Sequence, residues 1–191
     1  MGYTREELMA AVSGQMPERR WGHTLGVMES AVILANRFGE DPQRADLAAL
    51  LHDVAKFWPI EQQEAVIRDN QLNAELLEYD KQLLHAEVGA FVAQNNYGIE
   101  DAGVLDAIRY HTSGRIGMTK LDKIICLADY IEPGRDFPGV DHIRELAEHS
   151  LEEALVAGLD STISFLIQKR KQIFPLTVLS RNDLIKQIGR K

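Results

Sequence analysis

The sequence has almost no cysteine and no long hydrophobic run, and both absences narrow the kind of protein it encodes. Its single cysteine, Cys126, excludes an internal disulfide framework and is expected in the core, between two apolar neighbours. No stretch reaches the roughly 18 consecutive apolar residues of a membrane span. Residues 1–7 lack the basic and apolar segments of a signal peptide. We therefore expect a cytoplasmic protein that does not engage a membrane.

Positive charge is also in short supply. The 191 residues carry a formal net charge of -8, which repels the phosphate backbone and argues against non-specific binding to nucleic acid. A small phosphorylated ligand is not excluded, because a few cations beside a metal reverse the sign of one cleft. The 45% hydrophobic content is sufficient for a large core. We expect one domain over residues 1–191.

Helical periodicity runs through the chain, and no segment alternates with the period of two that a strand requires. Capping signals at Thr4, Asp41 and Thr119 predict three helix starts. The expected fold class is all-α, a single-domain helical bundle. The clearest predicted helices span about 18–38, 42–55, 60–68, 73–79, 85–96, 101–110, 119–132 and 150–171. Pro175 is expected to end a helix and Ser180 to begin the terminal one.

An adjacent histidine and aspartate, His52 and Asp53, close the apolar helix that begins at Pro42. An imidazole and a carboxylate are costly to desolvate without a partner, and a metal cation would compensate both. The alternative is structural: Asp53 caps a neighbouring helix and His52 is a hydrogen-bonded core residue. The segment Leu50–Lys56 leaves these two interpretations open.

Six polar residues stand in or at the edge of apolar helical surroundings on five different predicted helices. They are His23, His52, Asp53, His85, His111 and Asp129. Imidazoles and carboxylates together form an N/O ligand set that suits one or two divalent ions such as iron, manganese or zinc. Each histidine alone is more often a satisfied core residue, and spacing does not show that the six converge. His142 and His149 lie on a charged helix and are expected at the surface.

The order of these residues resembles the HD-domain metal-dependent phosphohydrolases. A closer likeness lies in the surrounding sequence, which reads RWGHTLGV at 20–27, LLHDVAK at 50–56, LH at 84–85, AIRYHT at 107–112 and KIICLADYIEPGR at 123–135. These blocks resemble the YqeK-type branch, the symmetrical bis(5'-nucleosyl)-tetraphosphatases of bacteria, over essentially the whole chain.

The resemblance implies that a metal-bound hydroxide attacks phosphorus and cleaves diadenosine tetraphosphate into two ADP. It implies one or two ions, Fe²⁺ first, with Mn²⁺, Zn²⁺ or another divalent metal as alternatives. The implied metal ligands are His23, His52, Asp53 and Asp129, with His85 and His111 for a second ion or for phosphate. Asp53 and Lys56 are the implied catalytic groups. The implied substrate contacts are His23, Lys56, His85, His111, Thr112, Asp129, Arg135, Pro175 and Ser180.

Several alternatives remain open at this stage. Lys56 and Arg135 also fit ordinary surface cations, and Thr112, Arg20 and Arg115 have no decided role. The ligand is a dinucleoside polyphosphate or a purine nucleotide such as ADP or GDP, and the sequence does not choose between adenine and guanine. The chain could instead be an HD-type nucleotidase or a nucleotide sensor without turnover. A homodimer is one option for the oligomeric state.

Overall fold

The computed structural model describes residues 2–189, which form ten α-helices and two short 3₁₀ helices. The expected all-α fold class is confirmed, and no strand occurs in this part of the chain. The helices are α1 (Arg5–Ser13), α2 (Glu18–Phe38), α3 (Pro42–Leu51), α4 (Ile60–Asp69), η1 (Ala74–Glu78), η2 (Lys81–Leu83), α5 (Leu84–Tyr97), α6 (Ala102–Arg109), α7 (Lys120–Ile131), α8 (Val140–Ala147), α9 (Leu151–Gln168) and α10 (Pro175–Ile188). The expected domain limits, 1 and 191, lie outside the described residues.

The predicted caps form where the sequence places them. Thr4 accepts a hydrogen bond from the Glu7 amide, and the Glu7 carboxylate accepts one from the Thr4 amide, which completes a capping box. Thr119 begins α7 in the same way. Asp41 caps α3 ahead of a proline at the first helical position. Local side-chain chemistry therefore sets these helix starts.

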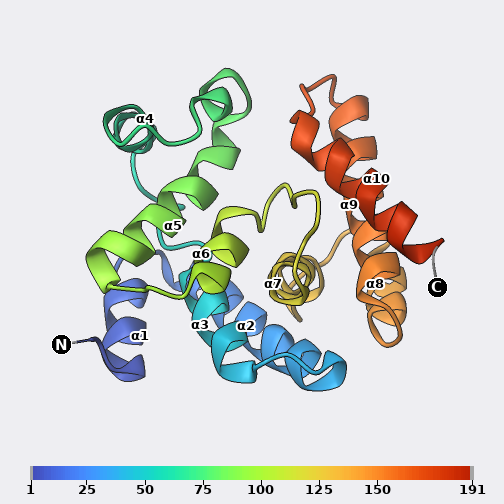
Figure 1. The fold of residues 1–191 in the computed structure, drawn as a ribbon, viewed down its shortest axis with the longest axis horizontal. Helices are drawn as coiled ribbons and strands as arrows, with labels where there is room; N and C mark the ends of the chain where they lie inside the picture. Colours follow the sequence, from blue (N-terminus) through green and yellow to red (C-terminus); the bar gives the residue numbers. More distant parts are fainter. Residues whose placement is uncertain (1, 190–191) are drawn as a thin grey trace.

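Helix α7 forms the middle of the bundle, and α2, α3, α6, α8 and α9 pack around it (Figure 1). Every residue of α7 from Leu121 to Ala128 is buried, and the expected core position of Cys126 is confirmed at 1% exposure. Helix α10 covers the outer side of α9. Among residues 2–189, no helix combines the length and apolar character needed to cross a bilayer.

The predicted C-terminal end of α3 is wrong. The helix was expected to continue to about Ala55, but it ends at Leu51, and turns follow over 52–57. The His52 ring nitrogen Nδ1 lies 2.6 Å from the Ala49 carbonyl oxygen, an oxygen that a continuing helix would use for its own ladder. The chain then tightens, since the amides of Val54 and Lys56 bond to carbonyls three residues back. His52 and Asp53 therefore leave the helix rather than lie on its face.

The predicted start of the terminal helix is also wrong. Pro175 begins α10 instead of ending a helix, because proline is preorganised for the first helical position and Phe174 before it is extended. Ser180 lies inside α10, where its hydroxyl donates to the Leu176 carbonyl at 2.6 Å. The sequence Ser180–Asp183 resembles an N-terminal cap, which explains why the helix was predicted to start five residues too late.

Candidate metal centre

Four histidine rings face one point from α2, the end of α3, α5 and the end of α6. In three of them Nδ1 lies 2.6–2.7 Å from the carbonyl oxygen three residues earlier, namely His52 with Ala49, His85 with Gln82 and His111 with Ile108. A carbonyl oxygen only accepts, so Nδ1 carries the proton and Nε2 presents a lone pair. These backbone contacts prepare three imidazoles as donors.

Asp53 lies between the rings, with one carboxylate oxygen toward each pair. Its Oδ2 is 3.3 Å from His52 Nε2 and 3.8 Å from His23 Nε2. Its Oδ1 is 3.0 Å from His85 Nε2 and 3.8 Å from His111 Nε2. The side chain is 1% exposed. Asp53 therefore faces one pair of imidazoles with each of its two oxygens.

Asp129 completes the cluster from the far end of α7. Its Oδ1 lies 3.0 Å from His23 Nε2 and also bonds to the Arg135 guanidinium, which donates in addition to the Asp129 backbone carbonyl at 2.7 Å. Burial opposes the charge on Asp129, but His23 and Arg135 outweigh it and hold the pKa of this carboxyl below its usual range. Asp129 is a carboxylate at neutral pH.

Protonation of the remaining groups follows from burial and neighbours. Burial opposes charge on Asp53, yet His52 and His85 outweigh it and hold the pKa of Asp53 well below its usual range. Burial, with the neighbouring His52 and His85, lowers the pKa of His111 to about 3. Burial also lowers the pKa of His85, whereas the pKa of His52 is raised because Asp53 outweighs the effect of burial. Ionised carboxylates and neutral imidazoles are the forms that bind metal.

The donor set fits a divalent ion. The buried atoms His23 Nε2, His52 Nε2 and Asp53 Oδ1 have no hydrogen-bond partner among the described residues, and such orphaned polar atoms are costly unless a cation satisfies them. Two groups each bring three ligand atoms within 4.8 Å of one another: His23, His52 and Asp129, and His52, Asp53 and His111. The fold brings all six candidate residues together at this point, which their spacing in the sequence did not show.

Cationic side chains surround the cluster. Arg20 donates to Asp53 Oδ2, and Lys56 Nζ lies 3.4 Å from His85 Nδ1. Burial is the main cause that lowers the pKa of Lys56. Arg115 is engaged elsewhere, with Asp106 and Asp122 at 2.8 Å each. Three cations therefore lie beside the cluster, namely Lys56, Arg20 and Arg135. Arg115 instead links the loop after α6 to Asp106 and Asp122.

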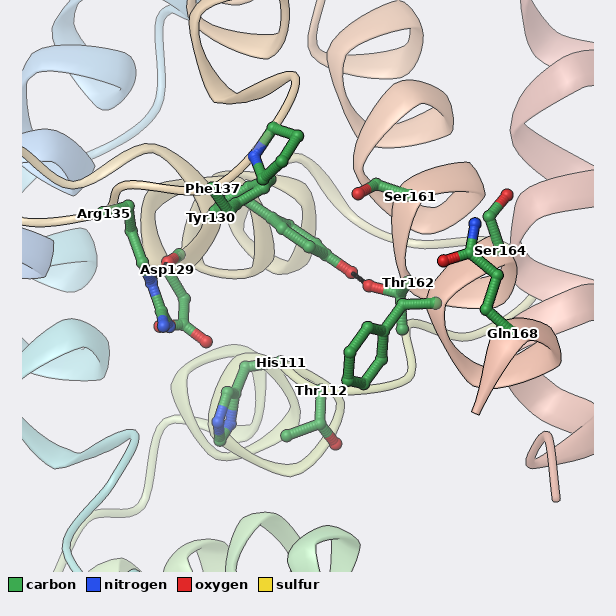
Figure 2. A pocket seen from close by; sticks show the side chains of 12 residues that line it. His111, Thr112, Asp129, Tyr130, Arg135, Phe137, Ser161, Thr162, Ser164 and Gln168 are labelled. Atoms are coloured by element: carbon green, nitrogen blue, oxygen red, sulfur yellow. Dashed lines mark hydrogen bonds and ion pairs between the residues drawn. The ribbon is translucent and has the colours of Figure 1, made fainter. Parts of the chain in front are cut away.

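Two neighbouring cavities are lined by residues of the cluster. The first, about 650 Å³, includes His111 and Asp129 and continues to Ser161, Ser164 and Gln168 of α9 (Figure 2). Its walls include Thr112 and three aromatic rings, Tyr130, Phe137 and Phe165. The second, about 1070 Å³, includes Arg19, Arg20 and His23. Arg135 and Phe137 line both cavities and form the wall between them.

Two residues implied by the family resemblance do not join this site. Pro175 and Ser180 line neither cavity. Ser180 is fully buried and spends its hydroxyl on Leu176. Its Cβ stands 2.9 Å from the position that a Cβ on Gly114 would take, so Ser180 packs against the loop after His111. Its contribution is to the support of that loop.

Glu132 is a site residue that the sequence interpretation missed. Its Oε1 lies 3.0 Å from His23 Nδ1, and the side chain is 5% exposed. The available signal was its position, three residues after Asp129 and directly after the last residue of α7. The proline and glycine that follow Glu132 indicate only the end of a helix.

Comparison with known proteins agrees with this arrangement. A family model described as the HD domain matches residues 20–134. A crystal structure from Clostridium acetobutylicum, described as a predicted HD superfamily hydrolase involved in NAD metabolism, superposes with a TM-score of 0.93 and 39% identity, and each chain is covered completely. The fold and its site therefore define a protein of the HD-domain class.

Two curated relatives narrow the assignment. The symmetrical bis(5'-nucleosyl)-tetraphosphatase of Bacillus subtilis is 49% identical over 95% of this chain and 97% of its own length. The protein of the same name from Staphylococcus aureus is 41% identical over 86% of both chains. The chain belongs to the family of symmetrical bis(5'-nucleosyl)-tetraphosphatases.

Proposed function

We propose that the chain hydrolyses bis(5'-nucleosyl) tetraphosphates such as diadenosine tetraphosphate to two nucleoside diphosphates. One observation carries the proposal: four imidazoles and two carboxylates from five segments meet at one point, and three of the six also line two adjoining cavities. When bound there, a divalent ion supplies an activated water near neutral pH and neutralises phosphate oxygens. Family membership supports the reaction class, and the B. subtilis relative carries the corresponding name.

The proposed ligands of the ion are His23, His52, Asp53 and Asp129. Fe²⁺ is our first candidate, and Mn²⁺ and Zn²⁺ suit the same nitrogen and oxygen donors. His85 and His111 face the second oxygen of Asp53, so they hold a second ion or contact a phosphate. Asp53 would hold an ion beside either of its oxygens and so keep the reacting centre in place.

The proposed charge-stabilising groups are Lys56 and Arg135. Lys56 lies beside His85 in a half-buried position, where its ammonium is poorly screened by water. Arg135 lies on the wall shared by the two cavities, and a guanidinium fork suits phosphate oxygens. Thr112 lines the first cavity and can donate its hydroxyl. These groups stabilise negative charge on the phosphoryl group as the bridging P–O bond breaks.

The shape of the site suits a substrate with two halves. The first cavity, with its aromatic rings and hydroxyls, matches a nucleoside, and the second carries Arg19 and Arg20 for phosphate. Because His111 and Asp129 line the first cavity and His23 lines the second, a substrate that extends through both would pass its phosphates beside the proposed ion. Cleavage at the middle gives two equal products.

Product analysis tests the proposal directly. Diadenosine tetraphosphate is incubated with protein loaded anaerobically with Fe²⁺ or with Mn²⁺, and the products are separated by ion-exchange chromatography. ADP as the only product is expected. ATP together with AMP would contradict symmetrical cleavage, turnover of a nucleoside monophosphate alone would favour a nucleotidase, and binding without turnover would favour a sensor.

A further inference from the structure

His23 differs from the other three histidines in how its ring is held. His52 and His111 follow the ends of α3 and α6, and His85 follows η2, so carbonyl oxygens left free at these helix ends are within reach. His23 is the sixth residue of the 21-residue helix α2, where the preceding carbonyls are engaged in the helix ladder. Its Nδ1 therefore needs a partner from another element.

That partner is the carboxylate of Glu132, which α7 supplies just beyond its last residue. Oε1 lies 3.0 Å from His23 Nδ1, and Oε2 accepts the Gly134 amide at 2.6 Å. A carboxylate only accepts, so His23 Nδ1 carries a proton toward Glu132, and Nε2 is left facing Asp129 and Asp53, where a bound cation would stand between its lone pair and the two carboxylates. Both oxygens of Glu132 are thus committed, and the side chain has one orientation.

The surrounding backbone is shaped to receive this carboxylate. Gly26 lies one turn after His23 on α2, and a Cβ there would stand 2.7 Å from Glu132 Oε2. The backbone carbonyl of Glu132 accepts from Arg144 of α8 at 3.1 Å, which ties the segment to a third helix. The carboxylate therefore sits in a fitted position rather than on a free surface.

We infer that Glu132 is the positioning residue of the metal centre, which fixes the tautomer and ring orientation of His23 and strengthens its Nε2 as a ligand. An imidazole whose N–H is hydrogen-bonded to a carboxylate is a stronger metal ligand than one whose N–H is bonded to a carbonyl. Loss of such a partner weakens metal binding by about 10- to 100-fold. Both ring nitrogens of His23 thus face carboxylates at the end of α7: Nε2 faces Asp129 and Nδ1 faces Glu132. The inference rests on the proposed metal centre.

The test measures metal affinity rather than turnover. Chelator-treated protein is titrated with Co²⁺ and Mn²⁺ against a fluorescent chelator, for wild type, Glu132→Ala, Glu132→Gln and Glu29→Gln. Glu29 lines the same cavity and is exposed, so it serves as the matched control. We expect about 10- to 100-fold weaker binding for Glu132→Ala. Glu132→Gln should lose less affinity than Glu132→Ala, because its amide oxygen can still accept from His23 Nδ1. Glu29→Gln should lose none.

A double-mutant cycle shows whether Glu132 acts through His23. If it does, Glu132→Ala added to His23→Ala causes no further loss of Co²⁺ affinity, and the Co²⁺ absorption spectrum of Glu132→Gln shifts while that of Glu29→Gln does not. Glutamine has nearly the volume of glutamate, so we expect the Glu132→Gln variant to fold and its metal affinity to be measurable.

Two results would overturn the inference. One is wild-type Co²⁺ affinity in both Glu132 variants, with or without a lower melting temperature of the metal-free protein, since that pattern describes a purely structural residue. The other is an equal loss from Glu132→Ala in the presence and absence of His23. If wild-type protein itself binds no metal, the proposed centre fails instead, so the two failures are distinguishable.

Discussion

The Nε2 atoms of His85 and His111 lie 3.2 Å apart, although both rings have already committed Nδ1 to a backbone carbonyl. Two lone pairs therefore face each other beside Asp53 Oδ1. A shared cation turns this repulsion into coordination. This contact between the two rings is the reason we propose a second ion or a phosphate beside Asp53 Oδ1.

The first prediction concerns the bridging carboxylate. Asp53→Ala and His52→Ala should each lose metal content and reduce hydrolysis of diadenosine tetraphosphate on the order of 10³-fold or more, because the activated water depends on the ion. Metal analysis of anaerobically purified protein and a product assay measure both effects. His142→Ala is the control, since its ring is exposed on α8. Full activity in either site variant would end the metal interpretation.

Arg135 allows a test of phosphate recognition. Arg135→Ala should weaken ADP binding about tenfold, the effect of losing one charge-assisted hydrogen bond worth about 1.5 kcal/mol. Isothermal titration measures the affinity, and metal content is followed because Arg135 also bonds Asp129. Arg181→Ala is the control, an arginine of α10 paired with Asp160 at 2.7 Å outside both cavities. Unchanged ADP affinity would remove Arg135 from the binding site.

The loop after α6 offers a matched pair for stability. Gly114 and Gly117 have φ angles of +65° and +71°. A Cβ at Gly117 meets open space, whereas one at Gly114 would meet Ser180 Cβ at 2.9 Å. Gly117→Ala should cost about 1 kcal/mol of unfolding free energy from backbone strain, and Gly114→Ala about 1–3 kcal/mol more from overpacking. Urea unfolding measures both, and equal costs would exclude the contact with Ser180.

A pH dependence follows from the pair of Asp101 and Arg44. The Arg44 guanidinium, 2.8 Å away, lowers the pKa of Asp101 to about 2, against about 3.9 in an unfolded chain. The stabilisation is therefore present above about pH 4 and is lost as the pH falls toward 2. Both side chains are more than a third exposed, so solvent screening limits the contribution to about 0.2–1 kcal/mol.

The measurement is urea unfolding of wild type and Asp101→Asn at several pH values. Asparagine keeps the oxygen that caps α6 but removes the charge. The difference in unfolding free energy should shrink between about pH 5 and 3. Asp69→Asn, at an exposed position at the end of α4, is the control. A difference that stays constant with pH would exclude the ion pair as its source.

Sequence patterns predicted most of the fold because helix starts depend on local chemistry. Thr4, Asp41 and Thr119 cap the helices they were expected to cap. Two boundaries were mispredicted where a local signal competed with another interaction. His52 captures a carbonyl that ends α3 early, and Ser180 bonds back to Leu176 inside α10.

The site shows a similar division. The six candidate ligands were recognisable because histidine and aspartate are unusual in apolar helices. Their convergence, and the separate faces of Asp53, depend on how five segments cross, which spacing does not encode. Glu132 was missed because its partner, His23, is 109 residues away in the sequence. Such a contact exists only after α2 and α7 have packed together.

The segment after Leu51 has a consequence beyond chemistry. His52 and Asp53 leave α3 and lie in turns, and their partners come from α2, α5, α6 and α7. An ion held there is a cross-link between distant parts of the chain, which binds the folded form and not the unfolded one. The free metal concentration then adds to the stability of the whole bundle. At low metal concentration the protein should therefore be degraded faster by proteases, in addition to losing the proposed activity.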